Sequence, residues 1–169
     1  FLEVVGLPVC IIDFNARVLA SSKWQRICTE FHRVNKQTLA RCLECDAVLA
    51  RQMLGSKPYA TYRCHNGLTD CVVPIVIENQ HMANLFIGQF FLVPPDMNFF
   101  AKQQADFGFD KEAYFKALSE VPIVAEDKIP AILDLLSGLA HQIAQLSLAE
   151  KRSRAAYASI EQQVIDRTS

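Results

Sequence analysis

Apolar residues follow one another almost without a break from Cys71 to Ile77. A strand that is apolar at nearly every position is typical of a sheet that is covered on both faces. A polar turn at 78–80 separates this run from a second apolar run, His81 to Phe91. The pattern therefore predicts a β-hairpin whose first strand is buried on both sides.

The rest of the chain divides into strands and helices at its turn and capping residues. A strand at 7–14, a tight turn at 15–17 and a returning antiparallel strand at 18–21 open the chain, and a further strand is expected at 59–64. Thr38 and Gly55 are suited to begin and end a helix. The expected helices start near 23–24 and cover 38–54, 98–107, 110–118 and 125 to the end. These elements predict an α/β (α+β) domain with a central antiparallel sheet flanked by helices.

The last helix carries apolar residues at alternating spacings of three and four. This seam consists of Ile129, Ile132, Leu136, Leu139, Ile143 and Leu146, and resumes at Tyr157, Ile160 and Val164. Such a heptad pattern fits either an amphipathic helix packed on its own sheet or a coiled coil. Beyond Glu150 the stretch 151–154 is too polar to be buried, so we expect a parallel homodimer coil there. It would lead to an output domain outside this sequence.

Size and charge restrict the class of protein. The chain of 169 residues is about one domain, with 17 Lys and Arg against 18 Asp and Glu. This balance, without a basic stripe, argues against direct nucleic-acid binding. No apolar run approaches the roughly 20 residues that span a bilayer, and the chain opens on Phe1 without a signal peptide. We expect a cytoplasmic segment of a longer protein, with no membrane contact in this part.

Six cysteines are present, and in a chain without an export signal they are expected to be reduced or to bind a metal. The candidate ligands are Cys28, His32, Cys42 and Cys64, and Cys45 follows Cys42 at the spacing of a C-x-x-C pair. Thiolates and imidazole at such spacings can close a tetrahedral zinc site. Free cysteines are equally at home as small apolar residues of a core or pocket wall. A zinc cofactor is therefore one of two open possibilities.

The pair Gly88-Gln89 interrupts the second strand of the hairpin. A glycine inside a strand often marks a bulge or a close approach, and the glutamine places an amide in an apolar wall. The turn at 66–70 adds polar side chains at the mouth of the same hairpin. An apolar pocket with a few polar groups is what a small-molecule site looks like. The candidate ligand-binding residues are Trp24, Tyr62, Asn66, Asp70, His81, Gln89 and Phe91.

Catalytic signatures are missing from the sequence. No protease or acyltransferase motif surrounds a cysteine, and no phosphate-binding glycine pattern or kinase motif is present. We therefore expect no catalytic residues and no enzyme activity in this segment.

Several short motifs occur in the order found in one known family. They are Ile27-Cys28 with Phe31-His32, Cys42, Tyr62-Arg63-Cys64, Asn66-Gly67-Leu68, Asp70, Val73-Pro74-Ile75 and Gly88-Gln89-Phe90-Phe91. With these residues the chain resembles the PocR-type ligand-binding domain, a PAS/GAF-like sensory module. Cys45 and Cys71 depart from the pattern of that family.

The resemblance implies a sensory domain at 1–148 and a helical linker at 149–169. Such modules are attached to sensor histidine kinases or transcriptional regulators of prokaryotes, and are thought to bind small hydrocarbon derivatives such as a short diol, alcohol or carboxylate. The signal would pass through the C-terminal helix of a homodimer. The alternative is a redox or metal sensor that uses Cys28, Cys42 and Cys64.

Overall fold

A computed structural model describes residues 6–13, 17–22, 24–52, 59–78 and 80–168. Five antiparallel strands form one sheet in the order β2-β1-β5-β4-β3. The strands are β1 (Val9–Ile12), β2 (Val18–Ser21), β3 (Ala60–Arg63), β4 (Thr69–Ile77) and β5 (Gln80–Phe90). The two long strands β4 and β5 therefore lie next to one another, as the hairpin pattern predicted. The expected mixed fold with a central antiparallel sheet is confirmed.

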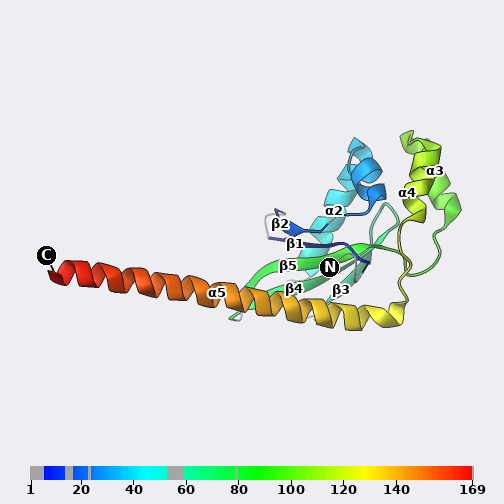
Figure 1. Ribbon diagram of the computed structural model, residues 1–169. Helices are drawn as coiled ribbons and strands as arrows, with labels where there is room; N and C mark the ends of the chain where they lie inside the picture. The colour runs from blue at the N-terminus through cyan, green and yellow to red at the C-terminus, as the bar shows by residue number, and fades with distance from the viewer. Residues whose placement is uncertain (1–5, 14–16, 23, 53–58, 79, 169) are drawn as a thin grey trace.

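Helices cover both faces of this sheet (Figure 1). The long helix α5 lies along one face, α2 lies on the other, and α3 and α4 stand together near the end of α2. The helical elements are the π-helix η1 (Ile27–His32), α2 (Lys36–Gln52), α3 (Met97–Phe107), α4 (Lys111–Ser119), the short η2 (Glu126–Lys128) and α5 (Ile129–Thr168). None of the helices described here is long and apolar enough to cross a membrane.

Three apolar clusters hold these layers together. The first joins the sheet to α5 through residues such as Cys71, Val73, Leu85 and Leu133. The second lies between η1, α3 and α4 and is rich in aromatic rings. The third lies on the face of the sheet opposite α5 and consists of Ile12, Ala60, Val72 and Phe86, with Cys10 and Tyr62 packed against it. Alternate residues of β4 thus face opposite layers, as a period of two requires.

Capping explains where two helices begin. Asp110 accepts the backbone N–H of Ala113 at the start of α4, as expected for an N-cap. The predicted cap of α2 was wrong, because Asn35 accepts from the backbone N–H groups of Gln37 and Thr38 and the helix begins at Lys36. Thr38 is instead buried and donates its hydroxyl to the carbonyl of His32. The predicted exit at Gly55 and the turn at 15–16 lie outside the described residues.

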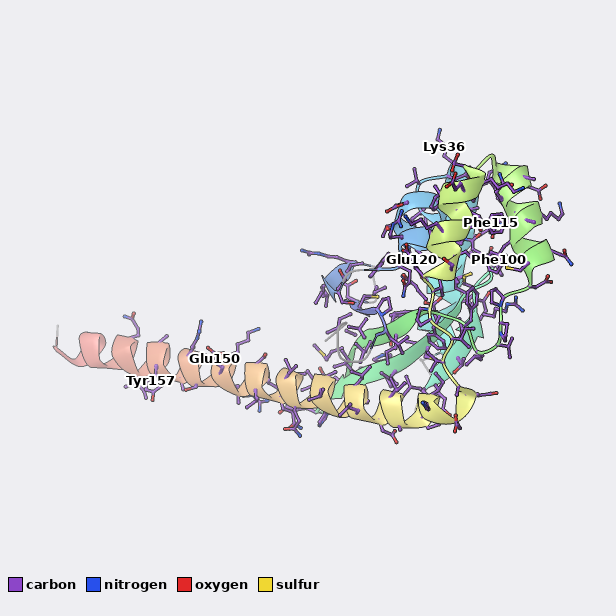
Figure 2. The ribbon with its side chains drawn as sticks, turned by 45° about the vertical axis from the view of Figure 1, so that its right-hand side comes forward. Lys36, Phe100, Phe115, Glu120, Glu150 and Tyr157 are labelled. Atoms are coloured by element: carbon purple, nitrogen blue, oxygen red, sulfur yellow. The ribbon has the colours of Figure 1, made fainter. Side chains whose placement is uncertain are left out.

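The apolar seam of α5 is buried against the sheet in its first part and exposed to solvent in its later part. Ile129 and Leu136 are buried against the sheet, whereas Leu139, Ile143 and Leu146 are 46%, 63% and 69% exposed. Of the two possibilities left open for this seam, packing on the chain's own sheet therefore holds for its first part, from Ile129 to Leu136. The helix then continues past the sheet, where Glu150 and Tyr157 project from it (Figure 2).

Candidate functional site

A small cavity lies between the helical layer of η1 and α2 and the adjoining ends of β4 and β5. Its volume is about 30 Å³, close to the space that one water molecule takes in the liquid. Four cysteines line it, namely Cys28, Cys42, Cys45 and Cys64. The remaining lining residues are His32, Arg33, Asp46, Leu68, Asp70 and Gln89. Polar and titratable groups are therefore concentrated around one small cavity.

A bulge in β5 positions the sheet side of this cavity. Thr69 pairs with Phe90 and Asp70 pairs with Gly88, so Gln89 is the extra residue. Its φ of 65° is in the left-handed region, which costs free energy for a residue with a side chain. The Oε1 atom of Gln89 accepts the backbone N–H of Gln25 over 2.6 Å. The bulge thus ties the sheet directly to the segment that leads into η1.

Close packing of Asp70 against Gly88 explains why a glycine stands in the strand. A Cβ atom on Gly88 would lie 1.8 Å from Oδ1 of Asp70. The same oxygen accepts the backbone N–H of Gln89 over 3.3 Å. Only a residue without a side chain leaves room for a carboxyl group at this point of the cavity wall.

The carboxyl group of Asp70 is unusual because it is hard to ionise. Burial, and to a smaller extent the charge of Asp46, raises its pKa from 3.8 to about 7. The hydrogen bond from the N–H of Gln89 and the charge of Arg33 act in the opposite direction without cancelling the rise. Near neutral pH this residue is therefore present both as a neutral acid, which can donate a hydrogen bond, and as a carboxylate.

Asp70→Asn is expected to stabilise the domain above neutral pH and to have little effect below about pH 4. Because the folded pKa lies above the unfolded one, the wild-type domain is most stable below the unfolded pKa. It loses stability as the pH rises towards the folded value of about 7. The full difference corresponds to on the order of 4 kcal/mol. Urea unfolding of both proteins between about pH 4 and pH 8 measures it, and parallel curves would contradict the assignment.

Three of the four cysteine side chains that line the cavity accept hydrogen bonds from N–H groups. Cys42 accepts from the side-chain amide of Asn66 over 3.1 Å, and Cys64 accepts from the backbone N–H of Leu68 over 3.3 Å. Cys45 accepts from the backbone N–H of His65 over 3.2 Å. Burial nevertheless raises the pKa of Cys42 and Cys64. Neutral thiols are weak nucleophiles and poor metal ligands until they lose a proton.

The four predicted metal ligands come together around the cavity, but not at one point. Cys28, His32, Cys42 and Cys64 all line it. Within the described part of the chain, no group of three or more His, Cys, Asp or Glu side chains is arranged to hold a metal ion. Zinc binding therefore remains a hypothesis that would require these side chains to rotate towards one another.

The π-helix η1 forms the wall opposite the sheet. Short π-helical segments are rare and often occur at functional sites. Arg33 follows η1 directly and pairs with Asp46 of α2 over 2.9 Å, while its guanidinium lies 4.4 Å from the ring centre of Trp24. At the other end of η1, Arg26 pairs with Glu120, which directly follows α4, over 2.8 Å. These ion pairs fix η1 to its neighbours at partly exposed positions.

The seven predicted ligand-binding residues differ in how close they lie to the cavity. Asp70 and Gln89 line the cavity. Tyr62 lies next to it, since its hydroxyl accepts from the thiol of Cys45 over 3.7 Å. Asn66 lies behind Cys42, and Trp24 lies under Arg33 rather than in the lining.

The other two residues lie elsewhere. His81 is near the far end of β5 and bonds to Asn84 over 2.8 Å. Phe91 packs edge-on against Phe100 of α3 and lines a separate hollow of about 290 Å³ with Leu92. The structure does not bring these two side chains to the cavity.

Sequence reasoning missed Arg33 and Asp46 as cavity residues. A signal was present for Asp46, because it lies four residues after Cys42 and so shares its face of α2. Arg33 gave no comparable signal, since a π-helix shifts its side chains from the positions that an α-helical pattern predicts.

Comparison with models of known protein families gives one match to this chain. The model of the sensory domain found in PocR matches residues 1–148. The chain belongs to the PocR sensory-domain family. This match supports a sensing role and includes all the residues of the cavity. Comparison with curated proteins and with solved structures found no significant match.

Proposed function

We propose that this PocR domain binds a small organic molecule, such as a short diol, alcohol or carboxylate, in the cavity between η1 and the sheet. The output would belong to a prokaryotic sensor histidine kinase or transcriptional regulator. The observation that carries the proposal is the meeting of Asp70 and the bulged Gln89 at one small cavity. Both residues are only partly exposed, and both side chains can exchange hydrogen bonds with a neutral guest.

The size of the cavity determines how a guest would enter. About 30 Å³ holds one water-sized group, whereas a short diol has about five heavy atoms. Binding would therefore enlarge the cavity by moving η1, α2 or the adjoining strand ends apart. A guest that fits only the enlarged form favours that form by its difference in affinity.

The chemistry of such a guest limits its affinity. At a ceiling of about 1.5 kcal/mol per heavy atom, five atoms contribute roughly 7–8 kcal/mol. This corresponds to micromolar binding at best. The expected affinity suits a sensor of a metabolite that is abundant when the response is needed.

Strand β4 provides a route from the cavity to α5. Asp70 lines the cavity, and the next residue, Cys71, belongs to the cluster that packs against α5. A shift of β4 would therefore reach the start of α5. The exposed apolar stripe further along α5, from Leu139 to Ile160, is proposed to pair with a second copy in a parallel coil. Ligand-dependent changes in that coil would reach the output domain.

Thermal shift measurements test the proposal. Propanediol, propanol and propionate are added separately, and the effective ligand is expected to raise the melting temperature in a saturable way. Asp70→Ala and Gln89→Ala are expected to remove this shift while the proteins stay folded. Met82→Ala, at an exposed position of the same strand, is the matched control and should keep it. Equal responses in all four proteins would rule out the cavity as the binding site.

A redox or metal sensor is the second candidate, because Cys28, Cys42 and Cys64 line the same cavity. Elemental analysis of protein purified without oxygen distinguishes the two. A structural zinc would contribute on the order of 10 kcal/mol to folding, so a strong chelator would unfold the domain. Metal-free protein with unchanged melting in chelator would exclude this candidate.

A further inference from the structure

An ion pair spans the part of the cavity wall that reaches solvent. Arg33 directly follows η1, Asp46 belongs to α2, and both residues line the cavity. Nη2 of Arg33 lies 2.9 Å from Oδ2 of Asp46, and the two side chains are 25% and 27% exposed. The lining residues Cys28, His32 and Cys42 are instead buried. The ion pair therefore lies at the mouth of the cavity, with the thiols behind it.

Trp24 holds the guanidinium of Arg33 in this position. The guanidinium carbon lies 4.4 Å from the centre of the indole ring, and a cation over the face of a tryptophan is attracted to it. A planar guanidinium can stack on a ring and donate hydrogen bonds at its edge at the same time. The contact with Trp24 thus stabilises the same arrangement of Arg33 as the ion pair with Asp46 does.

The deeper contacts of the cavity wall are costlier to break than this ion pair. Cys42, for example, accepts from the side-chain amide of Asn66 over 3.1 Å, and both residues are buried. A buried polar group that loses its partner bears the full cost of its desolvation. Arg33 and Asp46 can both turn into water, which replaces their hydrogen bond, and exposed ion pairs contribute little to stability. The wall therefore opens more easily at the ion pair than at the buried contacts.

We propose that the Arg33–Asp46 ion pair, held by Trp24, is the gate through which solvent and small molecules enter the cavity. With the gate closed, a volume of about 30 Å³ leaves room for about one water molecule. When Arg33 turns away from Asp46, the wall between the end of η1 and α2 opens, and the thiols of the cavity meet solvent. The gate regulates access to the site of the proposed function and rests on that function, but a thiol reagent tests it without a guest.

Labelling of the cavity thiols measures how readily the gate opens. Methyl methanethiosulfonate, a small uncharged reagent, is added to the folded domain, and peptide mass spectrometry gives a labelling rate for each cysteine. The rates for Cys28 and Cys42 are expected to rise about twofold to fivefold in Asp46→Asn and in Arg33→Gln, because each change removes the ion pair. Trp24→Leu, which removes the cation–π contact, is expected to raise them by about the same factor.

The opposite charges of the pair separate opening of the gate from a change in thiol reactivity. Burial raises the pKa of Cys42, the charge of Arg33 opposes this rise, and the charge of Asp46 adds to it. The thiolate is the reacting form, so without a gate Arg33→Gln would slow the labelling of Cys42 and Asp46→Asn would speed it. The gate predicts faster labelling in both variants, and in Trp24→Leu, which changes no charge. Opposite effects of the two charge changes, with unchanged labelling in Trp24→Leu, would overturn the proposal.

Glu120→Gln is the matched control for loosening of η1 as a whole. It removes the 2.8 Å ion pair between Arg26, at the other end of η1, and Glu120, which follows α4 (Figure 2). This change should leave the labelling of the cavity thiols as it is in the wild-type protein. Cys71, which is buried in the cluster that packs against α5, reports general unfolding. Faster labelling of the cavity thiols in Glu120→Gln, or of Cys71 in the gate variants, would overturn the gate in favour of general loosening.

The outcomes separate the gate from the proposed function. Cavity thiols that label at the same rate in the wild-type protein and in all three gate variants overturn the gate and leave guest binding standing. Absence of a thermal shift with every probe, together with faster labelling in the gate variants, contradicts the proposed function and leaves the entry route standing.

Discussion

Replacing Ile143 and Tyr157 by aspartate is expected to convert a dimer of this domain into a monomer. Both side chains are exposed, 63% and 67% respectively, and lie on the stripe of α5 that avoids the sheet. From Leu139 onwards the stripe has the alternating spacing of a coiled coil. In a parallel dimer each aspartate would face its own copy in an apolar seam. The dimer is expected to weaken at least about a hundredfold.

Sedimentation equilibrium over a range of protein concentrations measures this effect. Ala155→Asp is the matched control, because Ala155 is exposed on the face of α5 opposite the seam and lies in the same projecting part. It should leave the dimer intact. A wild-type chain that stays monomeric at high concentration would refute the second copy as the partner of this stripe. Equal weakening of the dimer by Ala155→Asp would also refute it.

Gly88→Ala is expected to destabilise the domain by about 3 kcal/mol or more and to abolish ligand binding. The added methyl group would lie 1.8 Å from Oδ1 and 2.7 Å from Cγ of Asp70. Asp70 would have to leave its place in the cavity wall, or the strands would have to separate. Denaturant unfolding measures the loss of stability, and thermal shift with the effective probe measures the loss of binding.

A double-mutant cycle shows whether the carboxyl group is the cause. In an Asp70→Ala background the next contact is with Cβ at 3.2 Å, which small movements can relieve. Gly88→Ala should therefore cost much less there, and the coupling should be on the order of 1–3 kcal/mol. Gly138→Ala is the control, since nothing lies within 4 Å of a Cβ there and the site is helical. It is expected to stabilise by about 0.5–1 kcal/mol. Equal costs in both backgrounds would show that Asp70 is not what excludes a side chain.

The fold was largely readable from short-range patterns. The β4–β5 hairpin followed from the run Cys71 to Ile77, and the helix expected at 110–118 corresponds to α4 (Lys111–Ser119). The sequence left the seam of α5 open between two interpretations, because its first residues are suited both to an internal core and to a coiled coil. Only the position of the sheet decides that Leu136 is buried while Leu139 is exposed.

The candidate site was only partly readable. Gly88-Gln89 drew attention because glycine is unexpected inside a strand, and the bulge indeed directs Gln89 to the cavity. The side chain of His32 meets the hydroxyl of Tyr114, which lies 82 residues away in sequence. No spacing rule relates two residues that meet only after α3 and α4 have packed on η1.

The central claim is that a small organic guest enters the space between η1 and the sheet. Amide chemical shifts recorded during a titration with the effective probe test it most directly. The account predicts saturable shifts centred on the N–H groups of Gln25, Leu68 and Gln89, which donate to groups at the cavity. Shifts confined to the groove between β4 and α5, around Val76 and Gly138, would contradict it.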